Sequence, residues 1–115
     1  MFFLCIHNGK ERMVEITGRK VIIGRPSSTM GMPDLNLQPD KNVSRRHAQV
    51  TLESGVYWIE DLGSRLGVLV NGLRLRAKRQ IKFGDRILIG RTEVKLVPSD
   101  SSELVVEEDK KKAGP

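Results

Sequence analysis

A single cysteine stands among the 115 residues, and this scarcity excludes functions that need paired or clustered thiols. Cys5 cannot form a disulfide within the chain. Together with His7 and His47 it makes up the soft metal ligands, but the three residues do not follow the spacing of known metal sites. We therefore expect no metal site and no cofactor, and take the cytoplasm as the default location.

Long apolar stretches are also missing. No run approaches the roughly 20 apolar residues that a membrane-spanning helix needs. The apolar start, MFFLCI, gives way to polar residues after six positions, whereas the core of a secretory signal peptide takes about 7 to 15. The sequence therefore predicts no membrane association, and we expect residues 2–7 to form a first strand.

Helical periodicity is lacking almost everywhere, which leaves strands as the main elements. Short runs rich in β-branched and aromatic residues alternate with turn signals about every 8 to 12 residues. This pattern is typical of all-β folds and predicts an antiparallel β-sandwich of about eleven strands. The expected strands span residues 2–7, 12–17, 21–24, 34–37, 47–54, 56–61, 68–70, 73–75, 80–83, 86–90 and 93–97.

Composition and charge both change at Pro98. Residues 1–97 hold 17 Lys and Arg against 9 Asp and Glu, whereas residues 98–115 hold 3 against 5. The last segment is rich in Ser, Pro, Gly and charge, so we expect a flexible tail or a linker to further domains of a longer chain. A basic domain attracts anionic partners, either nucleic acid or a phosphorylated or acidic protein.

Three polar loops, at residues 25–33, 38–46 and 63–67, hold most of the unusual polar residues. Arg25 follows a strand and offers five fixed donors to a phosphate or carboxylate. The second loop ends with Ser44, Arg45 and Arg46, and a hydroxyl beside two guanidinium groups can form a phosphate cradle. Because binding residues commonly lie on loops at one end of a rigid sandwich, we expect the site there.

The patterns of catalytic sites are absent. Ser44, His47 and Asp61 have the residue types of a nucleophilic triad, but their spacing does not form a nucleophile elbow and indicates no oxyanion hole. A Gly-rich phosphate loop of the nucleotide-binding kind is missing too. We therefore expect no enzymatic activity and a structural role for His47.

Aromatic residues are few, at three Phe, one Trp and one Tyr, and this scarcity bears on nucleic-acid binding. Residues 73–82 carry five Lys and Arg, with Arg74 and Arg76 on the solvent face of the expected strand. No aromatic residue alternates with them to form a stacking platform. A basic strand face that only contacts solvent is therefore favoured over a nucleic-acid-binding site.

In their order along the chain, the motifs resemble the forkhead-associated (FHA) domain family. The matching residues are Gly24-Arg25, Ser44-x-x-His47, DLGS at 61–64, Gly67, VNG at 70–72 and FGDRILIG at 83–90. The resemblance covers about residues 1–97. It implies an eleven-stranded β-sandwich whose loops at one end bind phosphothreonine-containing peptides, without enzymatic activity.

The resemblance also implies roles for individual positions. Arg25 and Ser44 match the family's phosphate-contacting residues, and Arg45 matches a position that contacts phosphate or peptide. Ser64 and Arg65 match the loop that closes the other side of the phosphate. The positions that in the family mainly hold the loops in shape are Gly24, His47, Gly67, Asn71 and Gly72.

The chain departs from the family pattern at residues 64–68, which read Ser-Arg-Leu-Gly-Val in place of Ser-x-Asn-Gly-Thr. Leu66 thus replaces an asparagine that typically hydrogen-bonds the bound peptide, and Val68 replaces a threonine. Losing one such hydrogen bond would lower affinity by about 0.5–1.5 kcal/mol, a fewfold to tenfold. A leucine at positive φ would be strained by about 1–2 kcal/mol, so we expect the loop to adopt a different turn there.

The sequence therefore predicts a phosphothreonine-peptide-binding signalling module, whose site includes Leu66 beside the cradle residues. The alternative is a domain of the same fold used for phospho-independent protein contact or self-association, with Leu66 as an apolar contact. Nucleic-acid binding through residues 74–82 is the third hypothesis, and it would require affinity that falls steeply with salt.

Overall fold

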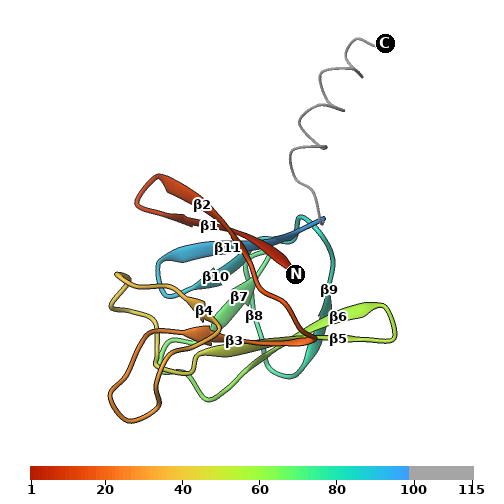
Figure 1. The fold of residues 1–115 in the computed structure, drawn as a ribbon. Helices are drawn as coiled ribbons and strands as arrows, with labels where there is room; N and C mark the ends of the chain where they lie inside the picture. Colours follow the sequence, from red (N-terminus) through yellow and green to blue (C-terminus); the bar gives the residue numbers. More distant parts are fainter. Residues whose placement is uncertain (99–115) are drawn as a thin grey trace.

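Eleven strands form where β-branched runs meet turn residues, as the sequence predicts. The structure is a computed structural model that describes residues 1–98. The strands are β1 (Phe2–His7), β2 (Lys10–Glu15), β3 (Lys20–Gly24), β4 (Leu35–Asn36), β5 (Ala48–Glu53), β6 (Val56–Asp61), β7 (Val68–Val70), β8 (Leu73–Arg74), β9 (Arg79–Ile81), β10 (Ile87–Ile89) and β11 (Thr92–Val97) (Figure 1).

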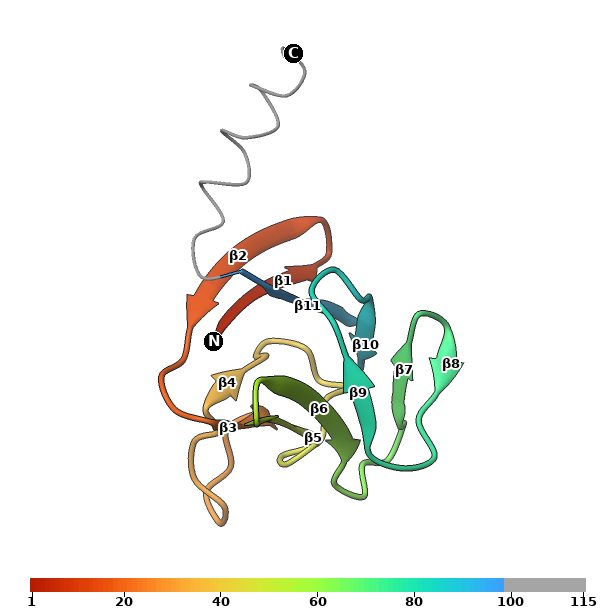
Figure 2. The ribbon, with the colours of Figure 1, turned by 90° about the vertical axis from the view of Figure 1, so that its right-hand side faces the viewer.

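The strands make two sheets that face one another across the core (Figure 2). The six-stranded sheet has the order β2-β1-β11-β10-β7-β8, and the five-stranded sheet has the order β4-β3-β5-β6-β9. Phe3 and Ile87 from the first sheet and Ile23 and Ile59 from the second are fully buried between them. This arrangement confirms the predicted sandwich.

Alternation along the strands decides which side chains enter the core. In β10, Ile87 and Ile89 are buried, whereas Leu88 between them is exposed. In β11, Thr92, Val94 and Leu96 are buried on the same principle. Cys5 of β1 is buried as well, and this burial raises the pKa of its thiol above the ordinary value.

Two details of the predicted strands are wrong. β2 begins at Lys10, two residues before the expected start, because Asn8 and Gly9 alone make the turn, with φ of 53° and 75°. β4 pairs with β3 in parallel, so the smaller sheet is mixed rather than antiparallel. A parallel neighbour needs a longer connection than a tight hairpin, and residues 25–34 provide it.

Three loops gather at one end of the sandwich, as both ribbon views show. They are residues 25–34 after β3, residues 37–47 before β5 and residues 62–67 between β6 and β7. In Figure 2 the end of the second loop lies between the other two. The fold thus brings together the three polar segments that the sequence singles out.

The predicted tail or linker, residues 98–115, lies outside the described residues except for Pro98, and its role stays a prediction. Within residues 1–98, no helix has the length and apolar composition needed to cross a membrane.

Candidate functional site

Residues 38–46 owe their shape to the carboxylate of Asp40, which is buried although it is charged. Its oxygens accept hydrogen bonds from the backbone N–H groups of Asn42 (2.9 Å) and Arg91 (2.7 Å) and from the hydroxyl of Thr92 (2.7 Å). Burial alone would raise the pKa of Asp40, but these hydrogen bonds and the nearby His7 lower it below its ordinary value. Asp40 therefore fastens the loop to the turn between β10 and β11.

His47 joins the second loop to the third, and its ring is fully buried. The backbone N–H of Ser44 donates to Nδ1 (3.0 Å), so Nδ1 carries no proton and the neutral ring holds its proton on Nε2. Nε2 then donates to the carbonyl oxygen of Gly67 (2.7 Å). Both ring nitrogens are occupied within the scaffold, so His47 has no nitrogen left to activate the Ser44 hydroxyl.

Gly24 lets the end of β3 lie directly against the second loop. A Cβ atom at this position would sit 2.0 Å from the carbonyl oxygen of Arg45, which no side chain can tolerate. The absence of a side chain therefore sets how closely Arg25 approaches Ser44 and Arg45.

Arg25 is half-buried and anchored by one of its nitrogens. Its Nε donates to the carbonyl oxygen of Val43 (2.7 Å), which fixes the plane of the guanidinium group. No Asp or Glu within residues 1–98 pairs with it. The two terminal nitrogens are therefore available to an anion from outside the chain.

The third loop begins with hydrogen bonds to Asp61, whose Oδ1 accepts from the backbone N–H groups of Gly63 (3.1 Å) and Ser64 (2.8 Å). The Ser64 hydroxyl in turn accepts from the backbone N–H of Gly67 (2.9 Å). The backbone N–H of Arg65 donates to the Oγ of Ser44 (3.2 Å), which ties this loop to the second one.

Leu66 avoids the strain that a positive φ would impose on it. The residue that takes the left-handed conformation in this turn is Gly67, with φ of 83°, and Leu66 is not among the non-glycine residues with positive φ. Glycine adopts such angles without steric cost, so the turn needs no asparagine at position 66. Leu66 is 48% exposed and stands beside Arg65.

Between the loops lies a groove with a volume of about 790 Å³. Four of the predicted site residues line it, namely Arg25, Ser44, Arg45 and Arg65, and Arg46 of the predicted cradle joins them. Two predicted residues do not line it: the Ser64 hydroxyl is bonded within its own loop, and Leu66 lies outside the lining.

Six further lining residues are not among the site residues predicted from the sequence, and two of them, Lys41 and Met30, bear on what the groove can bind. Lys41 lies in the predicted loop 38–46 and its charge was an available signal, whereas an exposed methionine in a loop carries none. Within residues 1–98, the lining with Lys41 holds five cations and includes no Asp or Glu.

Arg45 links the groove to the first loop. Its Nη1 donates to the hydroxyl of Thr29 (3.2 Å), which also lies 3.0 Å from the hydroxyl of Ser27. A groove with this charge and these free N–H and O–H donors suits a compact dianion such as a phosphate.

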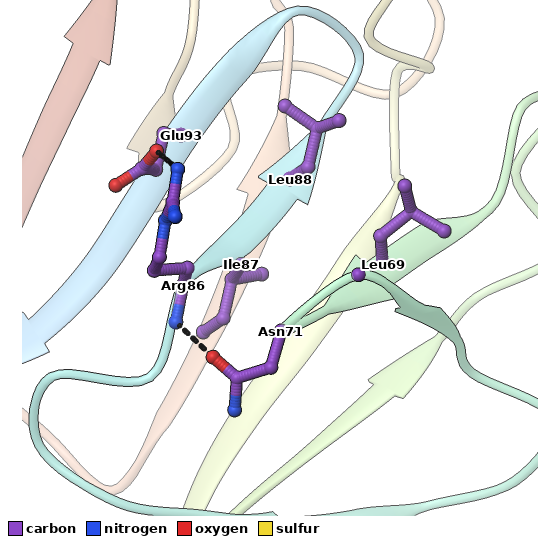
Figure 3. Close-up of a pocket in the computed structure, with 7 residues that line it drawn as sticks. Leu69, Asn71, Arg86, Ile87, Leu88 and Glu93 are labelled. Atoms are coloured by element: carbon purple, nitrogen blue, oxygen red, sulfur yellow. Dashed lines mark hydrogen bonds and ion pairs between the residues drawn. The ribbon is translucent and has the colours of Figure 1, made fainter.

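Asn71 and Gly72 act away from the groove, at the turn between β7 and β8, where their φ angles are 51° and 85°. The Asn71 Oδ1 accepts from the backbone N–H of Arg86 (2.9 Å) (Figure 3). Its Nδ2 donates to Asp85 (3.1 Å). This hydrogen bonding holds the turn against β10. The hollow beside it, of about 480 Å³, shares no lining residue with the groove.

Comparisons with known proteins identify the family to which these features correspond. The family model of the FHA domain matches residues 21–90. The FraH protein of Nostoc sp. is 35% identical over 79 residues, which cover 64% of this chain and 27% of FraH. The chain spans between 27% and 55% of the length of the four curated relatives compared.

Two solved structures are similar across most of the chain. The FHA domain of the CT664 protein from Chlamydia trachomatis has 27% identity and a TM-score of 0.67, covering 87% of this chain and 100% of that one. Mycobacterium tuberculosis EmbR in complex with a low affinity phosphopeptide has 28% identity and a TM-score of 0.69, covering 84% of this chain and 24% of that one. The match of the family model over most of the chain, together with the sandwich and its three loops, shows that the chain belongs to the FHA domain family.

Proposed function

We propose that this chain is a phosphothreonine-peptide-binding module that recognises phosphorylated partner proteins in signalling. The observation that carries the proposal is the groove between the three loops, which five cations line without any Asp or Glu. Charge-assisted hydrogen bonds of the kind such a lining offers are each worth about 1.5–3 kcal/mol. A phosphate carries nearly two charges and three acceptor oxygens, so it uses such a lining better than a carboxylate does.

The roles of the individual residues follow from their free donors. Arg25 presents its terminal nitrogens, because Nε is bonded to Val43. The Ser44 oxygen accepts the N–H of Arg65, which leaves the hydroxyl hydrogen free to donate to a phosphate oxygen. Arg45 contacts phosphate or peptide from the side of the first loop, and Arg65 closes the opposite side.

Family membership supports a peptide ligand over a free anion. EmbR, a structural neighbour, is described in complex with a phosphopeptide, which fits the same use of the fold. The preference for threonine over serine is taken from the family, since no residue of the groove shows it by itself. His47 does not serve as a general base for Ser44, because both of its nitrogens are engaged with backbone groups.

The experiment is a titration of the full chain with one phosphothreonine peptide and its unphosphorylated twin, repeated for the variant Arg25→Ala. We expect the phosphorylated peptide alone to bind, and the variant to lose at least about tenfold in affinity. Arg76→Ala is the matched control, because Arg76 is exposed and lies outside the groove.

The same titration tests the second candidate function, phospho-independent protein contact. The observation that favours it is Leu66, which presents an apolar side chain at 48% exposure where the family pattern has a polar one. Equal binding of the two peptides, unaffected by Arg25→Ala, would support this candidate and overturn phosphate recognition.

A further inference from the structure

Exposed apolar side chains lie on two of the three loops that form the groove. Seven large apolar residues of the described chain are exposed, and three of them lie on the first and third loops. These three are Met30 (49% exposed), Met32 (70%) and Leu66 (48%). Single exposed apolar residues are common on protein surfaces, but three of them on the loops that form a polar groove indicate a contact surface.

Met30 and Met32 lie on a loop with a fixed shape. The backbones of Ser27 and Gly31 exchange two hydrogen bonds (3.0 and 2.8 Å), and the Ser27 hydroxyl accepts from the N–H groups of Thr29 and Met30. The methionine side chains are therefore presented by a tied turn, which lowers the entropy lost when a ligand packs on them.

A second, smaller recess of about 120 Å³ adjoins the groove at this turn. Met30, Arg45 and Arg46 line both hollows, so the two share a wall. The rest of the recess includes Met32 and Pro33 together with the charged Asp34, so apolar and polar groups both line it. Its size suits one aliphatic side chain, and the flexible thioethers of methionine adapt to several such shapes.

Leu66 lies on the other side of the groove. Its neighbour Arg65 lines the groove and donates its backbone N–H to Ser44, so Leu66 directly follows a lining residue in the chain. The loops that bear Met30 and Leu66 lie on either side of the segment before β5 in Figure 2. A peptide whose phosphate sits among the cations would thus meet an apolar surface in both directions.

The surplus of cations raises the question whether acidic neighbours of the phosphothreonine would be preferred. Arg45 and Arg46 are exposed, and exposed charge pairs contribute little because water and salt screen them. An aliphatic side chain placed against Met30 and Met32 or against Leu66 instead removes apolar area from water, an effect that salt does not screen.

We propose that the groove selects phosphothreonine peptides that carry an aliphatic side chain on each side of the phosphorylated residue, one seated against Met30 and Met32 and the other against Leu66. This inference rests on the proposed function and adds the chemical class of the partner sequence. The methionines contact the residue on one side of the phosphothreonine and Leu66 contacts the residue on the other side. The two residues therefore contribute independently to the affinity of the peptide.

The test measures dissociation constants of the full chain for a set of phosphothreonine peptides. The set has Ala on both flanks, Leu on one flank, Leu on the other, Leu on both, and Asp on both, together with the unphosphorylated twin of each. We expect each Leu to tighten binding about threefold to tenfold over Ala, and Asp to give less than Leu.

Variants show which apolar residues of the protein contact which side of the phosphothreonine. Leu66→Asn is expected to remove the preference for Leu on one flank, and the double change Met30→Gln and Met32→Gln to remove it on the opposite flank. The Ala peptide measures any change in phosphate binding itself, so the preference is taken as the ratio of the Leu to the Ala affinity within each variant. The matched controls are Leu73→Asn and Met13→Gln, which change exposed apolar residues outside the groove.

The outcomes separate this inference from the proposed function. Equal affinities for Leu and Ala peptides, or tighter binding of Asp peptides, would overturn the inference while phosphate recognition stands. Failure of every phosphorylated peptide to bind better than its twin would overturn the proposed function itself. An unchanged dispersion of amide NMR peaks in each variant ensures that a lost preference reflects the side chain and not unfolding.

Discussion

At the scale of single residues, Asp40 shows how a buried charge can shape a binding loop without entering the groove. Its carboxylate takes three hydrogen bonds, two of them from Arg91 and Thr92, which are 51 and 52 positions away. A partnership over this distance has no local signal, so the sequence did not reveal it. Ser44 and His47, in contrast, lie within one motif and were found as a pair.

Replacing Asp40 with asparagine tests this role. The amide cannot accept all three hydrogen bonds as a carboxylate does, so we expect the free energy of unfolding at pH 7 to fall by about 1–3 kcal/mol. Urea unfolding followed by tryptophan fluorescence measures the change. An unfolding free energy equal to that of the unchanged chain would show that the carboxylate does not hold the loop.

Asp40 also predicts a dependence of stability on pH. Its pKa in the folded chain lies below the ordinary value of 3.8, so its contribution is present above about pH 4 and is lost as the pH falls through the folded pKa. Urea midpoints measured from pH 7 down to pH 2 should therefore decline more steeply for the unchanged chain than for Asp40→Asn. Parallel curves for the two proteins would contradict this assignment.

Gly24 offers a test of close packing. In Gly24→Ala the new methyl group would meet the Arg45 carbonyl oxygen at 2.0 Å, so the second loop must move away from β3. We expect a loss of stability of about 1–3 kcal/mol and weaker phosphopeptide binding, because the spacing of Arg25 from Ser44 changes. Thermal unfolding and a peptide titration give the two values, and an alanine variant that matches the original in both would refute the account of this contact.

At the scale of elements, most strands were predictable because they are short runs rich in β-branched and aromatic residues bounded by turn residues. The direction of β4 was not, since pairing depends on the path of residues 25–34 rather than on the strand itself. The same loop bears Met30 and Met32, and the sequence did not predict that these two side chains are exposed. Local patterns therefore gave the elements and the charged half of the groove, but not its apolar rim.

The link between the second and third loops can be broken at His47. His47→Phe keeps an aromatic ring in the core but leaves the Ser44 N–H and the Gly67 carbonyl without partners. Each unsatisfied buried group costs about 1–3 kcal/mol, so we expect lower stability and weaker binding together. Asn71→Ala is the matched comparison, since its loss should lower stability while leaving phosphopeptide affinity unchanged. Binding that falls equally in both variants would indicate a general loss of structure rather than a specific link.

At the scale of the whole molecule, the distribution of charge predicts how salt acts on binding. Residues 1–97 carry 17 Lys and Arg against 9 Asp and Glu, and five cations line the groove. Raising the ionic strength from about 0.05 to 0.5 M should weaken phosphopeptide binding about threefold to tenfold through screening. Calorimetric titrations at several salt concentrations measure the slope, and affinity that does not change with salt would argue against an anionic ligand.

The central claim is that the groove recognises a phosphate on a peptide, and an amide NMR titration with a phosphothreonine peptide and its unphosphorylated twin tests it most directly. The account predicts shifts at Arg25, at residues 44–46 and at residues 63–67 with the phosphorylated peptide only. No shifts at these positions with either peptide, or the same shifts with both, would contradict it.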